Sequence, residues 1–197
     1  MEIIFVIILG ILSYFEPCTI ATHTLLAAYS HQARGWNRWR PILSMWGTRT
    51  ILILALAMLF QWRLAPVEWN PFATTAALLF LAIIYIISRF QYIPIPHLEF
   101  YRGLPGGKKL PPSIQLGLTL PACTLPLVVI VIGITLSRNS YGFATLIAAL
   151  YGSFFSLPVA VLTITGLTAS VRGTLTFLAN TTPFITAIFI LLLIFIF

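Results

Sequence analysis

The stretch "SYFEPCTIATHT", Ser13 to Thr24, lies in the middle of an apolar run that otherwise has the composition of a membrane helix. Within it a glutamate and a proline directly precede Cys18. A second apolar run contains "LPACTLPLVV", Leu120 to Val129, with the only other cysteine of the chain, Cys123. The fold therefore has to accommodate two apolar runs that each carry a cysteine beside prolines.

The composition of the whole chain is that of a membrane protein. Of its 197 residues, 59% are hydrophobic and only 8% are charged, and the mean hydropathy is +1.01. This leaves too little polar surface to cover a water-soluble globule of this size. The apolar runs are continuous rather than alternating, which argues against an outer-membrane barrel. We therefore expect an all-α membrane protein.

Six apolar runs are long enough to be counted as helices, since a spanning helix needs about 20 residues. The first run continues past Pro17 and has no basic segment before it, so we expect a retained helix rather than a cleaved signal peptide. Residues 89–112 are rich in proline and glycine and cannot form a regular helix throughout. They form either a connector on the lipid headgroups or a docking surface for a cytoplasmic partner. The expected helices are about 3–29, 42–62, 71–88, 113–136, 141–167 and 175–197.

Basic residues concentrate on one side of the predicted bundle. The loops after the first, third and fifth helices hold eight of them, whereas only Arg63 and Arg138 lie in the other loops. Positively charged loops usually stay in the cytoplasm, so both chain ends are expected outside. Trp36, Trp39 and Trp46 fit an aromatic belt at the membrane interface. The eight basic residues are Arg34, Arg38, Arg40, Arg89, Arg102, Lys108, Lys109 and Arg172.

The two halves of this single domain, 1–197, predict an inverted repeat. Three helices precede the long loop (about 89–112) and three follow it, so the second half enters the membrane from the opposite side. "EPCTIAT" in repeat one (about 1–90) resembles "PACTLPL" in repeat two (about 113–197). Each cysteine lies within roughly 3 Å of rise of its helix centre. Inverted repeats bring matching midplane positions together, and broken helices often build a site there.

The two cysteines are candidates for a reversible disulfide, because facing midplane positions can meet its distance requirement. Cys18 and Cys123 could equally be small apolar core residues or a fixed staple between helices. Three prolines favour a redox role: Pro17, Pro121 and Pro126 interrupt the helices, which suggests a cavity at this depth. A half-helix starting near each cysteine would stabilise the thiolate that attacks a disulfide.

Glu16 is an ionisable residue at membrane depth, where such residues are expensive and usually functional. We expect it to carry protons to and from the thiols. The alternative is a structural Glu16 that is hydrogen-bonded to His23 or to a threonine. His23 is offset around the helix from Cys18, and we favour a packed or water-contacting role for it over catalysis.

Taken together, these features resemble the CcdA/DsbD family of membrane thiol-disulfide exchangers, also called the cytochrome c biogenesis protein transmembrane region. The resemblance covers the whole chain in topology, but its motifs are confined to "EPCT" and "PACTLP". It implies that Cys18 and Cys123 are the catalytic pair of an oxidoreductase and that Pro17, Pro121 and Pro126 shape the helices around them. The chain departs from the family pattern at Glu16, Ala21 and Ala122.

The resemblance also implies partners and a location. Electrons would come from cytoplasmic thioredoxin and pass to a thioredoxin-like protein outside, in support of cytochrome c maturation or disulfide repair. The protein would be a multi-pass component of a prokaryotic cytoplasmic membrane and would need no cofactor and no nucleic acid.

Two other functions remain open at this point. In a soft-metal-ion transporter, Cys18, Cys123, His23 and Glu16 would line the pathway, because thiolate and imidazole bind copper and zinc well. No Cys-x-x-Cys pattern supports that function. The chain could also be a structural membrane subunit with two incidental cysteines.

Overall fold

The computed structural model describes residues 2–64, 79–80, 83, 87, 97–138 and 140–194. Nearly all regular structure in this part of the chain is helical, which confirms the predicted all-α fold. The exceptions are two very short strands, β1 and β2. In chain order the elements are α1 (Glu2–Phe15), α2 (Pro17–Gln32), α3 (Trp36–Leu64), β1 (Leu98–Glu99), η1 (Phe100–Gly103), η2 (Gly107–Lys109), α5 (Pro112–Gly117), β2 (Thr119–Leu120), η3 (Ala122–Thr124), α6 (Leu125–Arg138), α7 (Tyr141–Thr165) and α8 (Ala169–Ile194).

Three helices, α3, α7 and α8, are long and apolar enough to cross a membrane, and α1 with α2 forms a fourth candidate as a bent pair. These elements correspond to the helices expected at 42–62, 141–167, 175–197 and 3–29. The helix expected at 71–88 lies largely outside the described residues. The count of six spans and the inverted repeat therefore stay predictions, while a membrane protein built of apolar helices is supported.

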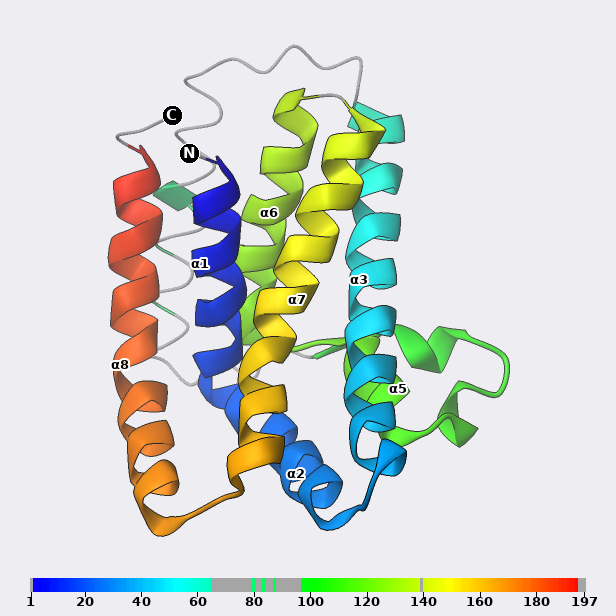
Figure 1. Ribbon diagram of the computed structural model, residues 1–197. Helices are drawn as coiled ribbons and strands as arrows, with labels where there is room; N and C mark the ends of the chain where they lie inside the picture. The colour runs from blue at the N-terminus through cyan, green and yellow to red at the C-terminus, as the bar shows by residue number, and fades with distance from the viewer. Residues whose placement is uncertain are drawn as a thin grey trace.

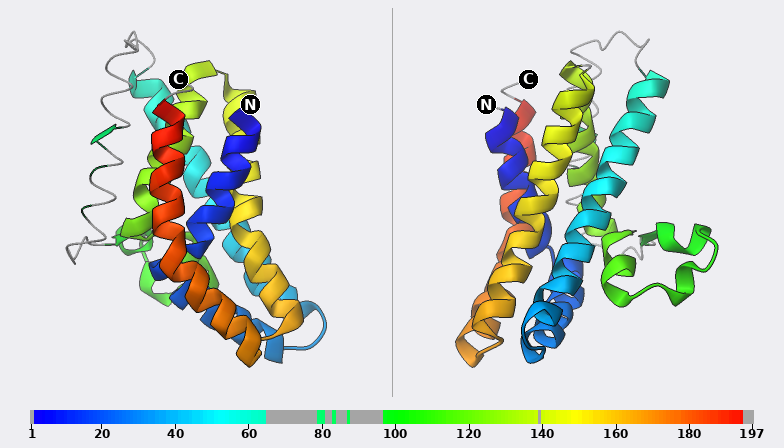
Figure 2. Two further views of the ribbon diagram at one scale, coloured as in Figure 1. Left: turned by 90° about the vertical axis from the view of Figure 1, so that its left-hand side faces the viewer. Right: turned by 45° about the vertical axis from the view of Figure 1, so that its right-hand side comes forward.

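Helix α7 lies at the centre of the bundle, between α1 and α3 and against α2 and α6 (Figures 1 and 2). Small residues allow close approach on two sides of it. A Cβ atom at Gly10 of α1 would lie 3.0 Å from the backbone oxygen of Tyr151 in α7. A Cβ atom at Gly152 would overlap the hydroxyl of Thr50 in α3. Both neighbours are thus packed tightly against the same turn of α7.

The first predicted helix is broken rather than continuous. Helix α1 ends at Phe15, α2 begins at Pro17, and the two axes differ by 78°. Glu16 between them is extended, with φ −62° and ψ 138°. Proline disfavours a helical conformation in the preceding residue but is well suited to the first position of a new helix. The break at Pro17 that the sequence suggested is therefore present.

The expectation of one helix over 113–136 was wrong. This segment consists of α5, then β2 and the single turn η3, and only then α6. Pro121 is the residue before η3, with φ −59° and ψ 142°, and Pro126 lies in the first turn of α6. Both prolines lie at positions where a missing N–H group is tolerated. Because a proline cannot extend a helix that precedes it, the two prolines divide this segment into short elements.

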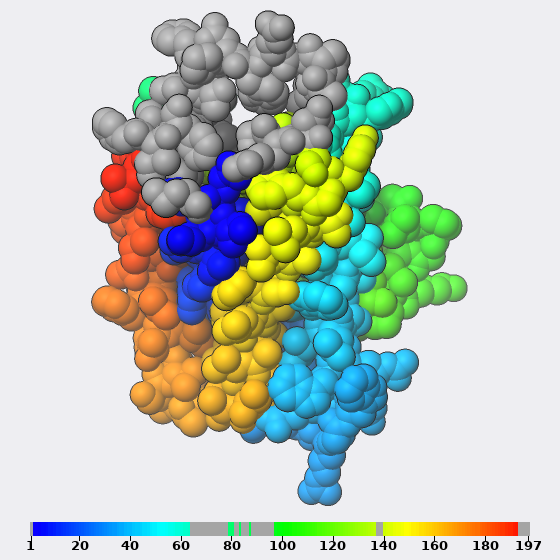
Figure 3. All heavy atoms as spheres, turned by 45° about the horizontal axis from the view of Figure 1, so that its top comes forward, coloured from blue at the N-terminus to red at the C-terminus, as the bar shows by residue number. Residues whose placement is uncertain are grey.

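Residues 98–117 form a lobe beside α3, which is green in the space-filling view of Figure 3. Strand β1 pairs with β2 in antiparallel register, with Leu98 opposite Leu120. At the base of the lobe Gly117 contacts α3, where an added Cβ atom would overlap the Thr48 hydroxyl and lie 2.9 Å from the Met45 backbone oxygen. The segment that leads to Cys123 is therefore fixed to α3.

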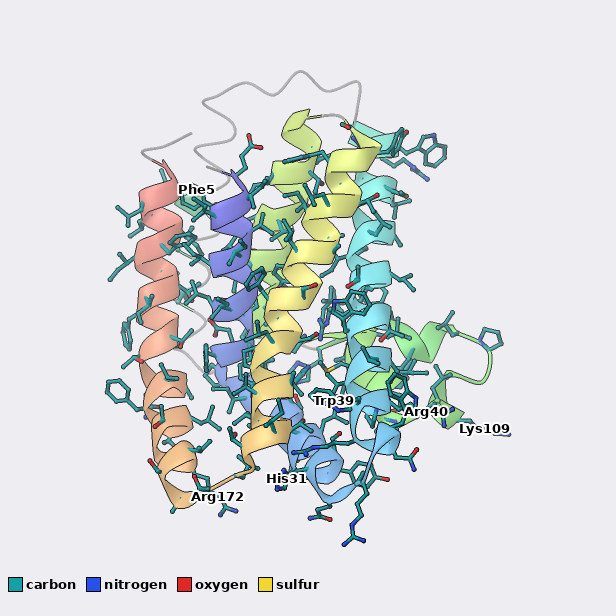
Figure 4. The ribbon with its side chains drawn as sticks, in the orientation of Figure 1. Phe5, His31, Trp39, Arg40, Lys109 and Arg172 are labelled. Carbon is teal, nitrogen blue, oxygen red and sulfur yellow. The ribbon has the colours of Figure 1, made fainter. Side chains whose placement is uncertain are left out.

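One end of the bundle is basic, and we call it the basic end; it carries Arg34, Arg38 and Arg172. There Arg38 Nη2 donates to the backbone oxygens of Thr163 and Ile164, the latter at 3.1 Å, and so caps the end of α7. Helix α1 begins and α8 ends at the opposite end (Figure 1). In Figure 4 the labels of His31, Trp39, Arg40, Lys109 and Arg172 lie in the lower half, and that of Phe5 lies near the upper end.

Candidate functional site: a cysteine pair at two helix starts

The structure brings Cys18 and Cys123 together. Cys18 is the second residue of α2, and Cys123 lies in η3, which contacts α2. The two thiol side chains interact with each other. Both residues are free thiols and half-buried. Two cysteines from separate halves of the chain thus lie within reach of one another.

Local sequence explains why both cysteines stand at helix starts. Pro17 begins α2 directly before Cys18, and Pro121 precedes the η3 turn that holds Cys123. The first turns of a helix carry backbone N–H groups without intrahelical partners and a partial positive charge. Two such ends converge on the sulfur atoms. This arrangement favours negative charge at the pair, as a thiolate requires.

Glu16 is fully buried at the break between α1 and α2. Its Oε1 accepts a hydrogen bond of 3.2 Å from Thr186 Oγ1 in α8. Its charge also acts on Cys123. The carboxyl group thus has a threonine partner, as the structural alternative required, and it also acts electrostatically on the cysteine pair.

Tyr151 of α7 is a further buried group at the pair that the sequence did not single out. Its hydroxyl donates to Ser13 Oγ at 2.8 Å. It interacts electrostatically with Cys123 and Glu16. A tyrosine within an apolar helix does not stand out in the hydrophobic pattern. The role of Tyr151 therefore becomes visible only when α1 is seen packed on α7.

His97 is a second residue that sequence reasoning missed. The backbone N–H of Ala122 donates to His97 Nδ1 at 3.4 Å, and His97 interacts electrostatically with Cys18. The pairing of β1 with β2 brings it there, because Leu98 is opposite Leu120. The only signal in the sequence was that His97 is the one histidine of the proline-rich loop at residues 89–112.

His23 and Arg49 belong to a separate buried cluster around Phe155. The His23 ring lies 5.2 Å from that of Phe155, and the Arg49 guanidinium lies 4.6 Å above it. Arg49 Nη2 also donates to the backbone oxygen of Leu116 at 3.0 Å. An arginine inside an apolar run is a recognised functional signal, and it could have been found from the sequence.

Within the described residues, no group of three or more His, Cys, Asp or Glu side chains could hold a metal ion together. Cys18 interacts with Cys123, and Glu16 acts electrostatically on Cys123, but His23 lies in the other cluster. No observation in the described part of the chain therefore favours the soft-metal transporter.

Comparison with known proteins leaves the site to be interpreted from its geometry. No protein-family model matches the chain, and no curated protein or solved structure matches it either.

Proposed function

We propose that the chain is a transmembrane thiol-disulfide exchanger in which Cys18 and Cys123 form and break one disulfide. The observation that carries the proposal is the contact between these two thiols. Their half-buried position supports access by a partner's sulfur, and the convergent helix starts support attack by a thiolate. The resemblance of "EPCT" and "PACTLP" to the CcdA/DsbD motifs points the same way.

The exchange is balanced in electrons and protons. A thiolate of cytoplasmic thioredoxin attacks one sulfur of the Cys18–Cys123 disulfide and forms a mixed disulfide, and the other sulfur leaves and takes a proton. The second thioredoxin thiolate then breaks the mixed disulfide, and the second cysteine takes a proton. The same steps in reverse order, with a thioredoxin-like disulfide outside, regenerate the pair.

Reduction potentials supply the direction. A thioredoxin couple near −270 mV and an acceptor near −180 mV differ by about 90 mV, or about 4 kcal/mol for two electrons. No cofactor is needed for this chemistry. The basic end of the bundle would face the cytoplasm by the positive-inside rule, and the acceptor would serve cytochrome c maturation or disulfide repair outside.

The experiment traps the mixed disulfide. Cys18→Ser and Cys123→Ser are each mixed with thioredoxin that lacks its resolving cysteine and carries thionitrobenzoate on its nucleophilic sulfur. Each mixed disulfide then releases one thionitrobenzoate and gives a dithiothreitol-sensitive adduct. We expect one single variant to form it rapidly, while the double variant forms none.

Two outcomes reject the proposal. The first is failure of both single variants to form an adduct faster than an unrelated membrane protein with one half-buried thiol. The second is full function in cells of the double serine variant, which would identify a structural subunit instead. A stoichiometric metal in the purified protein, lost together with both cysteines, would favour the transporter.

A further inference from the structure

The buried face of α2 carries an unusual row of polar side chains. Thr19, His23 and Ser30 are all fully buried and are spaced so that they lie along one side of the helix. Each has a polar side-chain atom without a hydrogen-bond partner: Thr19 Oγ1, His23 Nε2 and Ser30 Oγ. The row begins one residue after Cys18. Between His23 and Ser30, Leu26 and Ala27 pack into the apolar core around Phe155, so the polar row is continuous only from Thr19 to His23.

The hydrogen bonding of His23 determines what its free nitrogen can do. Its Nδ1 lies 2.9 Å from the backbone oxygen of Thr19, which can only accept, so Nδ1 carries the proton. In a neutral ring Nε2 is then an acceptor. This acceptor is buried beside the rings of Tyr14, at a centroid distance of 6.4 Å, and Phe155, at 5.2 Å.

Helices α1 and α3 present complementary groups to His23. Tyr14 of α1 has a buried hydroxyl without a partner, and Arg49 of α3 has a buried Nε donor without one. The Tyr14 ring lies 6.4 Å from the His23 ring, and Arg49 and His23 pack on the same Phe155 ring. Donors and an acceptor thus occur together around His23.

Buried polar groups are almost always satisfied, by protein or by internal water. We propose that Thr19 and His23 of α2, with Tyr14 and Arg49, line a narrow polar seam that holds water and exchanges protons with the Cys18–Cys123 pair. The water in the seam follows from the unpartnered groups alone. Its use for the cysteine pair rests on the proposed exchange function.

Reduction of the disulfide puts one new proton on each sulfur, and reoxidation removes both. The seam supplies and removes these protons at Thr19, next to Cys18. Arg49 gives the seam a fixed positive charge that repels a free hydronium ion. A negative thiolate at the far end offsets this repulsion, so protons pass when the pair needs them and do not leak otherwise.

The first test detects the water directly. The full-length protein in lipid nanodiscs is exposed to X-ray-generated hydroxyl radicals, and oxidation is measured by mass spectrometry. Tyr14 and Tyr151 form a matched pair, since both are buried tyrosines and only Tyr151 has a bonded hydroxyl. We expect faster oxidation of Tyr14 than of Tyr151. Equal rates, or no oxidation of Tyr14, would overturn the seam.

The second test measures proton delivery without thioredoxin. The oxidised pair is reduced by dithiothreitol in H2O and in D2O, for the unaltered protein, Thr19→Val and the control Thr24→Val. Thr24 Oγ1 bonds the backbone oxygen of Ile20 at 2.6 Å, so its loss leaves the seam intact. We expect Thr19→Val to slow reduction by about tenfold or more and to raise the solvent isotope effect.

These results separate the two proposals. If Thr19→Val matches Thr24→Val in rate and isotope effect, the seam does not deliver protons. If thioredoxin forms no adduct while Tyr14 is still oxidised faster than Tyr151, the seam stands and the exchange function fails. If the purified protein forms no Cys18–Cys123 disulfide at all, the footprinting comparison alone decides whether the seam holds water.

Discussion

Gly117 offers the sharpest test of how the second cysteine is positioned. In Gly117→Ala the new Cβ atom overlaps the Thr48 hydroxyl and lies 2.9 Å from the Met45 backbone oxygen. The hydroxyl can turn away, but the backbone oxygen cannot, so α5 must move off α3. Overpacking of this kind destabilises a protein by about 1–3 kcal/mol.

A second loss follows from the same displacement. Arg49 Nη2 donates to the Leu116 backbone oxygen at 3.0 Å, directly before Gly117. Hydrogen bonds to charged groups contribute about 1.5–3 kcal/mol. We therefore expect Gly117→Ala to lower the free energy of unfolding by about 2.5–6 kcal/mol. It should also reduce the yield of the Cys18–Cys123 disulfide under mild oxidation, because α5 leads through β2 to Cys123.

The assay is unfolding by sodium dodecyl sulfate in bicelles, followed by tryptophan fluorescence, together with quantified disulfide yield. Gly133→Ala in α6 is the control, since its Cβ atom meets no atom of another element within 4 Å. It should be neutral or stabilising by up to about 1 kcal/mol. Adding Thr48→Ala to Gly117→Ala should restore only part of the loss. Equal stability and equal disulfide yield in the two glycine variants would refute the reasoning.

Three further changes test the site and the basic end. Glu16→Gln should slow turnover and alter its pH profile, and an unchanged rate between about pH 6 and 8 would remove Glu16 from proton transfer. His97→Ala should slow the alkylation of Cys18, measured by mass spectrometry, because a group that interacts with the thiol is lost; equal alkylation would contradict that role. Arg38→Met should destabilise the protein by about 1–3 kcal/mol, since the Ile164 oxygen loses its donor and the Thr163 oxygen keeps only His31 Nδ1, at 2.7 Å. The exposed Arg172→Met is its control in the same unfolding assay, and an equal effect of both would show that the cap contributes nothing.

The sequence predicted the long helices because their apolar runs extend well beyond the length of a buried helix segment. For example, the sequence predicted a helix over 141–167, and α7 spans 141–165. An apolar run with clear ends therefore defines a helix well. The break at Pro17 was also predictable, since proline acts locally on the residue before it. Features that depend on neighbouring residues, such as helix length and a proline break, can therefore be predicted from the sequence.

The site depends more on contacts between distant segments, and these are harder to predict. The pairing of Leu98 with Leu120 places His97 beside the cysteines, yet two-residue strands carry no periodic pattern. The apolar composition of 113–136 hid three separate elements, because apolar runs alone do not distinguish a helix from extended segments between prolines. Depth and symmetry predict that Cys18 and Cys123 face each other, but they do not give the distance between the two sulfur atoms.

The glycine contacts on α7 constrain how a partner on either side of the membrane could reach the sulfurs. At Gly10 and Gly152, α1 and α3 pack closely against one turn of α7, so we expect these three helices to move as one rigid unit. A large rotation of one half of the bundle against the other would have to break the close contacts at Gly10 and Gly152 together. The segment from α5 to Cys123 is held against α3 at Gly117. In the proposed exchange, the disulfide would then become accessible through local movement of α2 at the Pro17 break, and not through rotation of one half of the bundle against the other.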